Sequence, residues 1–349
     1  MEKGKVFFSD NGYKELTNYL KDKESYSKIF VLVDSNTSEH CLSPFLQNLG
    51  ILKDYELIEI EPGEENKNIN TVVNLWETLT ELGADRKSLM INLGGGVLTD
   101  MGGFVASTFK RGIKFINVPT TLLSMVDAST GGKTGIDLGN LKNQIGVFNL
   151  PEMVVISSEF LSTLDSRQMR SGLAEMIKHG LIADEYHWER LNDLDNLDLS
   201  SLDSLIQQSV SVKIKVVKED PTEQGLRKIL NFGHTIGHAV ETFYMDTDKM
   251  LFHGEAIAIG MIAEAYLSTL KTGFEMDDAL KIKKVILEYF PKTEIDKKDF
   301  QAILDLTKHD KKNVSGVIGF SLLESIGSCA YDCYAFPNEI EEALEFYVE

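Results

Sequence analysis

A chain of 349 residues is longer than one ordinary domain and fits two, and 43% hydrophobic with 26% charged residues is typical of a folded globular protein. The formal net charge of −19 disfavours binding to nucleic acid or to an anionic membrane, because both are polyanions. It also makes any local concentration of Lys and Arg informative, since an anionic ligand would need one.

We expect a cytoplasmic protein that does not enter a membrane. The segment MEKGKVFFSD lacks the apolar stretch of a signal peptide, and no apolar run reaches the length of a transmembrane helix. Cys41, Cys329 and Cys333 are too few for a disulfide framework. Buried thiols explain them better than a metal site.

Short apolar runs alternate with helical patterns in the first half of the chain. Five runs are expected to be strands, at 29–34, 55–60, 88–93, 114–118 and 153–156. A helical pattern over 70–82 ends at Gly83. This alternation predicts a parallel sheet covered by helices on both faces, as in a Rossmann-like α/β domain.

Helical patterns dominate the second half of the chain, where strand-like runs are scarce. Helices are expected over 167–182, 202–218, 226–243, 255–271 and 276–289. The sequence therefore predicts an α/β domain over 1–157 followed by an all-α domain over 158–349.

The third strand-like run leads directly into a glycine-rich turn, 94–96. Glycines let a backbone approach a ligand closely, and the following helix N-terminus would favour a phosphate. The spacing is not GxGxxG, because Thr99 holds the sixth position, so a dinucleotide site and a purely structural turn are about equally supported. Asp34, Thr120 and Thr121 follow other runs, where they could bind a ribose or cap a helix.

One glutamate and three histidines of the helical half suggest a metal site. Glu175 lies in an apolar helical pattern, where a carboxylate needs a cation or a metal. His234 and His238 are one helical turn apart, and His253 begins the next helix. One Glu and two His would form the open three-ligand shell of a catalytic zinc. Spacing alone favours the His234–His238 pair over His234–His253, and core histidines bonded to backbone are a third interpretation.

Basic residues occur in settings that are unusual for solvated lysines. These settings are glycine-rich loops, apolar helix faces, the turn before His234 and a KHDKKN segment. The residues that occupy them are Lys133, Lys142, Lys178, Lys213, Arg227, Lys311 and Lys312. Asn143 and Asn231 accompany them. Any one could be a surface residue, but a substrate with both a carboxylate and a phosphate would require about this set.

Six segments resemble, in order, the successive motifs of the 3-dehydroquinate synthase family. They span about residues 60–325 and read GGGVLTDMGGFVAS, KRGIKFINVPTTLLSMVDASTGGKTGID, KNQIG, GLAEMIKHG, LRKILNFGHTIGHAVE and FHGEAIAIGM. The lysine-rich motifs are similar to the sugar phosphate cyclase branch, rather than to the glycerol and metal-dependent alcohol dehydrogenases of the wider fold family. One departure is Leu141, where the family commonly has a glycine before the lysine.

The resemblance implies residues for each ligand. It implies Zn²⁺ or Co²⁺ on Glu175, His234 and His253, which makes His238 a substrate contact. The implied NAD contacts are Asp34, Asn36, Glu64, Lys67, Gly95, Gly96, Val97, Asp100, Thr120, Thr121, Lys133, Lys142, Phe160 and Thr163. The implied substrate contacts are Asp127, Lys133, Lys142, Asn143, Lys178, Lys213, Arg227, Asn231, His238 and one of Lys311 and Lys312. Arg111 resembles a residue that reaches across a homodimer interface to the substrate phosphate.

The implied activity is conversion of 3-deoxy-D-arabino-heptulosonate 7-phosphate to 3-dehydroquinate and phosphate, in the shikimate pathway of aromatic amino acid biosynthesis. Three alternatives remain open. The chain could be a valiolone or inosose synthase, a net dehydrogenase that releases NADH, or an inactive homologue that only binds a partner.

Overall fold

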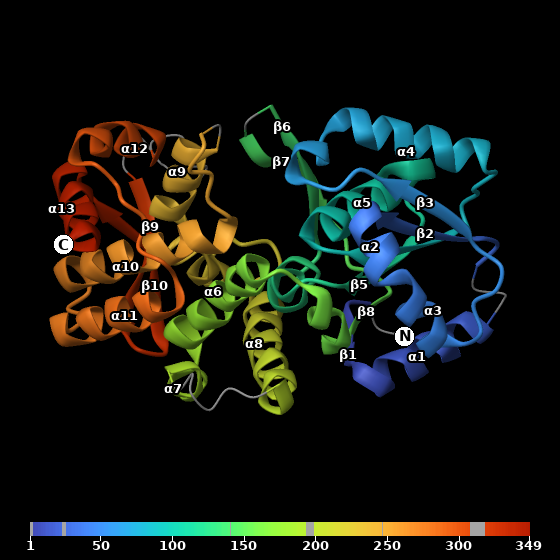
Figure 1. The fold of residues 1–349 in the computed structure, drawn as a ribbon, viewed down its shortest axis with the longest axis horizontal. Coiled ribbons are helices and arrows are strands. Elements are labelled where there is room, and N and C mark those ends of the chain that lie inside the picture. Colours follow the sequence, from blue (N-terminus) through green and yellow to red (C-terminus); the bar gives the residue numbers. More distant parts are fainter. Residues whose placement is uncertain (1–2, 23–25, 140, 193–198, 246, 308–317) are drawn as a thin grey trace. The chain divides into compact units, whose positions relative to one another are not determined.

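The computed structural model describes residues 3–22, 26–139, 141–192, 199–245, 247–307 and 318–349. They form two compact units, Met1–Asp165 and Ser166–Glu349 (Figure 1). Among the described residues no helix is long and apolar enough to cross a membrane.

The division between the units follows Asp165, whereas the sequence placed it after residue 157. The 3₁₀ helix η4 (Ser158–Thr163) lies between these two positions. Its Glu159 accepts hydrogen bonds from Tyr13 and Asn48, so η4 is tied to the first unit.

A six-stranded parallel sheet forms the centre of the first unit, in the order β1-β8-β5-β4-β2-β3. The strands are β1 (Lys5–Phe8), β2 (Ile29–Asp34), β3 (Glu56–Ile60), β4 (Leu89–Gly94), β5 (Lys114–Pro119) and β8 (Met153–Ile156). All five predicted strands are present, and β1 is an addition that the sequence did not predict.

The helices of the first unit connect these strands. They are α1 (Ser9–Lys21), α2 (Ser35–His40), α3 (Leu42–Leu49), η1 (Glu64–Asn66), α4 (Ile69–Glu81), α5 (Gly96–Thr108), η2 (Phe109–Arg111) and η3 (Ser124–Ala128). A separate antiparallel hairpin, β6 (Lys133–Leu138) and β7 (Leu141–Phe148), precedes β8.

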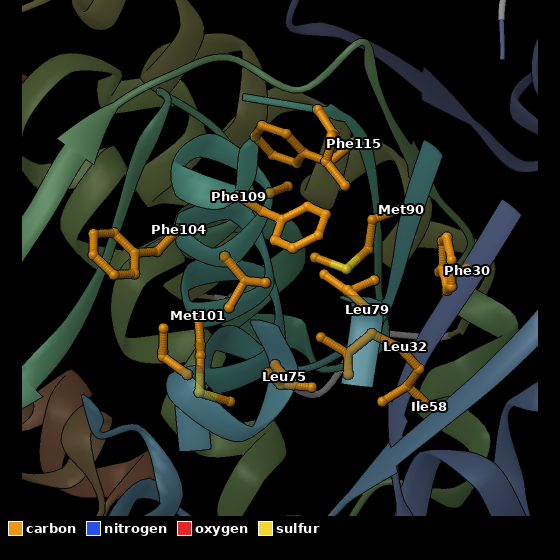
Figure 2. Close-up of a cluster of buried hydrophobic side chains, with 14 of the residues drawn as sticks. Phe30, Leu32, Ile58, Leu75, Leu79, Met90, Met101, Phe104, Phe109 and Phe115 are labelled. Atoms are coloured by element: carbon orange, nitrogen blue, oxygen red, sulfur yellow. The ribbon is translucent and has the colours of Figure 1, made fainter. Parts of the chain in front are cut away.

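Side chains from the sheet, α4 and α5 form one hydrophobic core in the first unit (Figure 2). Phe30 and Met90 come from the sheet, Leu79 from α4 and Phe104 from α5. The central strands are continuous apolar runs because both of their faces are covered. Gly102 of α5 keeps that helix close to the sheet, since a Cβ there would lie 2.2 Å from Asn92 Oδ1.

The second unit is mainly helical, where the sequence predicted an all-α domain. Its helices are α6 (Ser166–Ala183), α7 (Glu185–Asn192), α8 (Leu199–Glu219), η6 (Leu226–Asn231), α9 (His234–Tyr244), α10 (His253–Lys271), α11 (Met276–Tyr289), η7 (Lys297–Asp299), α12 (Phe300–Thr307) and α13 (Pro337–Val348). It also contains an antiparallel hairpin, β9 (Ile318–Ser325) and β10 (Ser328–Ala335), which the sequence analysis did not predict.

The predicted helix over 226–243 is interrupted, and the expectation of one continuous helix was wrong. Gly233 has a φ of +79°, a left-handed conformation that separates η6 from α9. The break lets α9 cross α10 closely. A Cβ on Gly260 of α10 would lie 1.9 Å from the carbonyl oxygen of Gly233, so only glycine fits at this crossing.

Candidate active site

A buried carboxylate is the centre of the candidate site in the second unit. Glu175 of α6 has no solvent exposure, and Lys178, one turn later on α6, donates a hydrogen bond to its Oε2. Oε1 of Glu175 has no hydrogen-bond partner among the described residues. Burial would raise the pKa of Glu175, but the ammonium of Lys178 and the ring of His253 lower it below its usual range. Oε1 is therefore a carboxylate oxygen without a close hydrogen bond, which suits it to bind a cation.

Two histidines from different helices face this oxygen. Nε2 of His234 lies 3.5 Å from Oε1 of Glu175, and Nε2 of His253 lies 3.7 Å from it. Nδ1 of His234 lies 3.0 Å from the carbonyl oxygen of Phe232, and Nδ1 of His253 lies 3.3 Å from Oε2 of Glu241. Such partners hold a histidine in the tautomer whose Nε2 can bind a metal.

The donor set fits a divalent metal ion. One carboxylate oxygen and two imidazole nitrogens form the ligand set of an open catalytic site. His238 is also close, because ligand atoms of His234, His238 and His253 all lie within 4.8 Å of one another. The structure thus brings both histidine pairs together. The Glu241 partner of His253 favours the His234–His253 pair, whereas His238 is exposed.

Two carboxylates beside His253 favour the protonated form of its ring. Burial would lower its pKa, but Glu241 and Glu175 raise that pKa to about 9. A metal ligand must be a neutral imidazole, so a cation bound here would take the place of a proton.

Two interactions of α10 position His253 beside Glu175. Arg167 of α6 binds both carboxylate oxygens of Glu255, at 2.8 and 2.6 Å. The amide of Gly254 donates to Ser171 Oγ at 3.0 Å, and a Cβ on this glycine would lie 2.3 Å from the Cα of Ser171. The start of α10 is therefore fixed against α6, the helix that carries Glu175.

A second buried carboxylate positions His234. Glu264 of α10 is fully buried and accepts hydrogen bonds from the amides of Gly233, at 2.6 Å, and Ile236, at 3.0 Å. These amides belong to the N-terminus of α9, where a negative charge is favoured by the helix dipole. Glu264 thus caps the helix that begins with His234.

Three predicted substrate contacts of the second unit are buried cations: Lys178, Lys213 and Arg227 are 1%, 5% and 1% exposed. Lys178 is paired with Glu175, and Arg227 donates a hydrogen bond to the carbonyl oxygen of Pro221 at 2.7 Å. The three cations place positive charge inside an otherwise acidic chain, which suits an anionic ligand. The predicted contact Asn231 is half-buried and donates to Oε1 of Glu223 at 2.9 Å.

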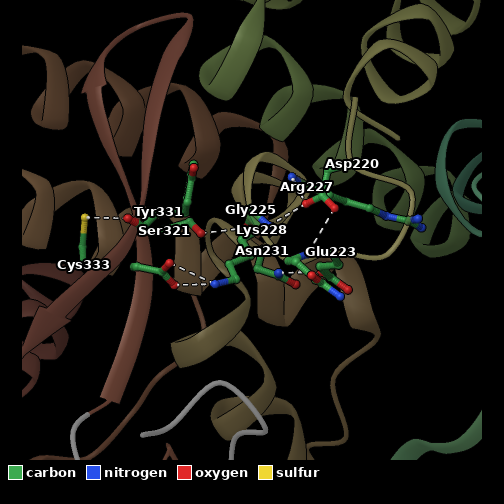
Figure 3. A network of polar contacts seen from close by, with 11 residues as sticks. Asp220, Glu223, Gly225, Arg227, Lys228, Asn231, Ser321, Tyr331 and Cys333 are labelled. Carbon is green, nitrogen blue, oxygen red and sulfur yellow. Dashed lines mark hydrogen bonds and ion pairs between the residues drawn. The ribbon is translucent and has the colours of Figure 1, made fainter. Parts of the chain in front are cut away.

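A polar network fixes the segment that carries Arg227 and Asn231 (Figure 3). Asp220 accepts hydrogen bonds from the amides of Gly225, at 2.7 Å, and Arg227, at 3.1 Å. Lys228 binds both carboxylate oxygens of Asp332 on β10, at 2.8 and 2.9 Å. The unpredicted hairpin β9–β10 therefore supports η6.

Most of the predicted cofactor residues of the first unit lie at or after the carboxyl ends of sheet strands, whereas Lys133 and Lys142 lie in the β6–β7 hairpin. Asp34 ends β2, η1 follows β3, the glycine turn follows β4, and η4 follows β8. Thr120 and Thr121 come directly after β5. Carboxyl ends of parallel strands meet at one edge of a sheet, where α/β domains bind their ligands. Of these residues, Phe160 is buried and Asn36 and Thr163 are exposed.

Structural roles account for part of this set. Asp34 accepts a hydrogen bond from the amide of Thr37 at 2.8 Å and caps α2, and Gly95 is the N-cap residue of α5. A Cβ on Gly95 would lie 3.1 Å from Thr121 Cγ2. Both interpretations of the turn, structural and phosphate-binding, remain compatible with this geometry.

Lys67, a predicted cofactor contact, is hydrogen-bonded to another predicted cofactor contact, Asp100, and to a predicted substrate contact, Asn143. Lys67 is 3% exposed, and its ammonium donates to Asp100 Oδ2 and to Asn143 Oδ1, at 2.7 Å each. Burial would lower the pKa of Lys67, but the carboxylate of Asp100 raises it above its usual range. Lys142 Nζ lies 3.9 Å from Glu64 Oε1.

The remaining predicted residues are more scattered. Asp127 lies half-buried in η3, and Lys133 begins β6 with its side chain exposed. Arg111 is exposed in the left-handed conformation, with a φ of 72°. Lys311 and Lys312 lie outside the described residues.

Sequence reasoning missed Glu241, Glu255, Glu264 and Asp220. Each carboxylate acts on a helix terminus, a backbone amide or a histidine ring rather than on a recognisable motif. The apolar neighbours of Glu264 were a signal of a buried carboxylate, the same signal that identified Glu175.

Known proteins resemble this chain over its whole length. Residues 57–171 match the family profile described as 3-dehydroquinate synthase N-terminal, and residues 172–313 match 3-dehydroquinate synthase C-terminal. The 3-dehydroquinate synthase of Parabacteroides distasonis is 43% identical, with 100% of this chain and 99% of the relative covered. That of Clostridium beijerinckii is 39% identical, with 86% of each chain covered.

Two solved structures of sugar phosphate cyclases are also similar. A 2-deoxy-scyllo-inosose synthase complexed with carbaglucose-6-phosphate, NAD⁺ and Co²⁺ superposes with a TM-score of 0.85 at 27% identity, covering 97% of this chain and 95% of that one. The 2-epi-5-epi-valiolone synthase of Streptomyces hygroscopicus, with NAD⁺ and Zn²⁺ bound, gives 0.80 at 26% identity, covering 99% and 97%.

Replacing Glu264 with Gln should destabilise the second unit. The amide can accept only one of the two backbone hydrogen bonds, and it loses the charge at the N-terminus of α9. We expect the free energy of unfolding to fall by about 2 kcal/mol. Urea denaturation measures it, with the exposed Glu275→Gln as control. Equal stability of the two variants would contradict the capping role.

Proposed function

The chain belongs to the 3-dehydroquinate synthase family, and we propose that it converts 3-deoxy-D-arabino-heptulosonate 7-phosphate to 3-dehydroquinate and phosphate. The observation that carries the proposal is the convergence of Glu175, His234 and His253 in a unit that also buries Lys213 and Arg227. The first set suits a metal and the second an anionic substrate.

We assign the ligands by unit. The α/β first unit binds NAD through the residues at the carboxyl ends of its strands, and the helical second unit binds one Zn²⁺ or Co²⁺ through Glu175, His234 and His253. Support comes from the cyclase structures that contain NAD⁺ with Co²⁺ or Zn²⁺. When bound, the metal would polarise a substrate hydroxyl and NAD would take up and return a hydride.

The residues of this chain bind and orient the substrate. Arg227, Lys213, Asn231 and His238 hold the carboxylate end, and Lys178, besides balancing Glu175, supplies a buried donor. Phosphate loss requires no strong protein base, because the substrate's own phosphate can accept the proton. Once the sugar ring opens, a held geometry favours one intramolecular aldol closure over others.

Carboxylate recognition separates this reaction from those of the inosose and valiolone synthases. Arg227 and Lys213 place two buried cations in this unit, where the carboxylate of a substrate would be favoured. Sequence similarity supports the same distinction. The chain is 43% identical to a 3-dehydroquinate synthase but 27% and 26% identical to the inosose and valiolone synthases of known structure.

We further propose a cytoplasmic homodimer. The hairpin β6–β7 and the residues beside it expose apolar side chains that a second copy of the chain would cover: Leu138, Leu141, Val147, Phe148 and Leu150. Arg111 lies exposed in the same unit and would reach the partner's substrate phosphate.

The reaction should use NAD catalytically, without net consumption. The hydride returns to the substrate, so we expect one phosphate released per substrate at NAD concentrations far below that of the substrate, without lasting NADH absorbance. A phosphate assay with the heptulosonate phosphate, NAD⁺ and Zn²⁺ or Co²⁺ measures this. Stoichiometric NADH accumulation would overturn the synthase assignment and favour a dehydrogenase.

The metal should depend on His253 and not on His238. His253→Ala removes a ligand and should abolish stoichiometric metal binding, whereas His238→Ala should keep the ion and lose turnover. Metal content after dialysis is the measurement. The assignment is wrong if His238→Ala loses the ion and His253→Ala retains it.

Dimer formation should depend on the exposed hairpin. Phe148→Glu places a charge in the apolar surface and should yield a monomer with much reduced turnover, since Arg111 could no longer act across the interface. Sedimentation and activity are measured together, with the exposed Tyr186→Glu on α7 as control. A fully active Phe148→Glu monomer would refute the dimer requirement.

A further inference from the structure

The β6–β7 hairpin contains an irregularity beside two predicted substrate contacts. Ile136 pairs with Ile145 and Leu138 pairs with Leu141, with a register shift between them. One residue of β6, Asp137, therefore faces residues 142–144 of β7. Bulges of this kind re-aim side chains, and this one contains Lys142 and Asn143.

Asp137 holds the bulge through the backbone. The amide of Asn143 donates to Asp137 Oδ1 at 2.6 Å, where a regular ladder would have offered a carbonyl. Asn143 has a φ of 51°, a left-handed conformation that Asn tolerates better than most residues. The carboxylate thus stabilises a conformation that the strand alone would not adopt.

Lys67 holds the same residue from the other side. Its Nζ donates to Asn143 Oδ1 at 2.7 Å, and its carbonyl oxygen accepts from the amide of Asp137 at 2.9 Å. Asp137, Asn143 and Lys67 therefore form a closed set of hydrogen bonds. Asn143 and Gln144 are exposed and Lys142 is only half-buried, so polar contacts rather than packing fix this part of the hairpin.

We propose that Asp137 is a positioning residue of the active site. It acts through Asn143: its carboxylate fixes the left-handed backbone and so sets the direction of the Lys142 and Asn143 side chains. The effect on turnover rests on the proposed synthase function, whereas the effect on the Asn143 amide does not.

Two substitutions separate position from charge. Asp137→Asn keeps an acceptor oxygen in place and removes the charge, whereas Asp137→Glu keeps the charge and displaces the oxygen by one methylene. A positioning role predicts that Asp137→Asn stays within about threefold of the wild-type kcat/KM and that Asp137→Glu loses about tenfold or more. Asp137→Ala should resemble Asp137→Glu, and the exposed Gln144→Ala is the matched control in the same bulge.

Hydrogen exchange of the Asn143 amide supplies a readout independent of turnover. We expect faster exchange, by about tenfold, in Asp137→Glu and Asp137→Ala but not in Asp137→Asn or Gln144→Ala. Unchanged exchange in Asp137→Glu overturns the proposal, and so does a greater kcat/KM loss in Asp137→Asn than in Asp137→Glu. A wild-type enzyme without synthase activity would instead contradict the proposed function, and the exchange data would still decide whether Asp137 fixes the bulge.

Discussion

The buried carboxylate of Glu175 is the interaction on which the helical unit depends. A fully buried charge requires compensation, and Lys178 on the same helix provides only part of it, because Oε1 has no donor among the described residues. The rest must come from other helices or from a bound cation. Several features of this unit, including the Arg167–Glu255 pair, the Gly233–Gly260 crossing and the Glu264 cap, bring two histidines to that oxygen.

Packed neighbours hold the two histidines beside Glu175. α10 is buried along most of its length and packs against α6 and α9, which fixes the helix that begins with His253. η6 is fixed by Asp220 and by the Lys228–Asp332 pair (Figure 3). Protein groups thus hold the charged side chains of this unit in place. Electrostatic interactions accelerate a reaction most when the charged groups are held in this way.

Periodicity predicted most of the fold because buried strands and helices leave their period in the sequence. The five predicted strands and the helical second half are present, and Glu175, His234, His238 and His253 were identified from residue type and spacing. Spacing alone favoured the His234–His238 pair, and the contact that favours His234–His253 instead, Glu241 of α9 with His253 of α10, joins two helices and leaves no pattern in the sequence. The break at Gly233 was missed because a glycine within an apolar helical pattern resembles ordinary helix. The hairpin β9–β10 was missed because a short continuous apolar run such as the buried part of β9 cannot be told from a buried helical segment by periodicity.

Carboxylates that hold backbone amides form a group that motif reading does not detect. Glu264 holds the start of α9, Asp220 holds η6 and Asp137 holds the β7 bulge. Their partners are peptide N–H groups, which every residue except proline carries, so no partner residue type marks them in the sequence. Histidines and lysines stand out in an acidic chain, but the carboxylates that position them are concealed among 54 acidic residues. Part of the acidity of this chain is therefore internal, and it holds the segments that carry His234, Arg227 and Asn143 of the candidate site.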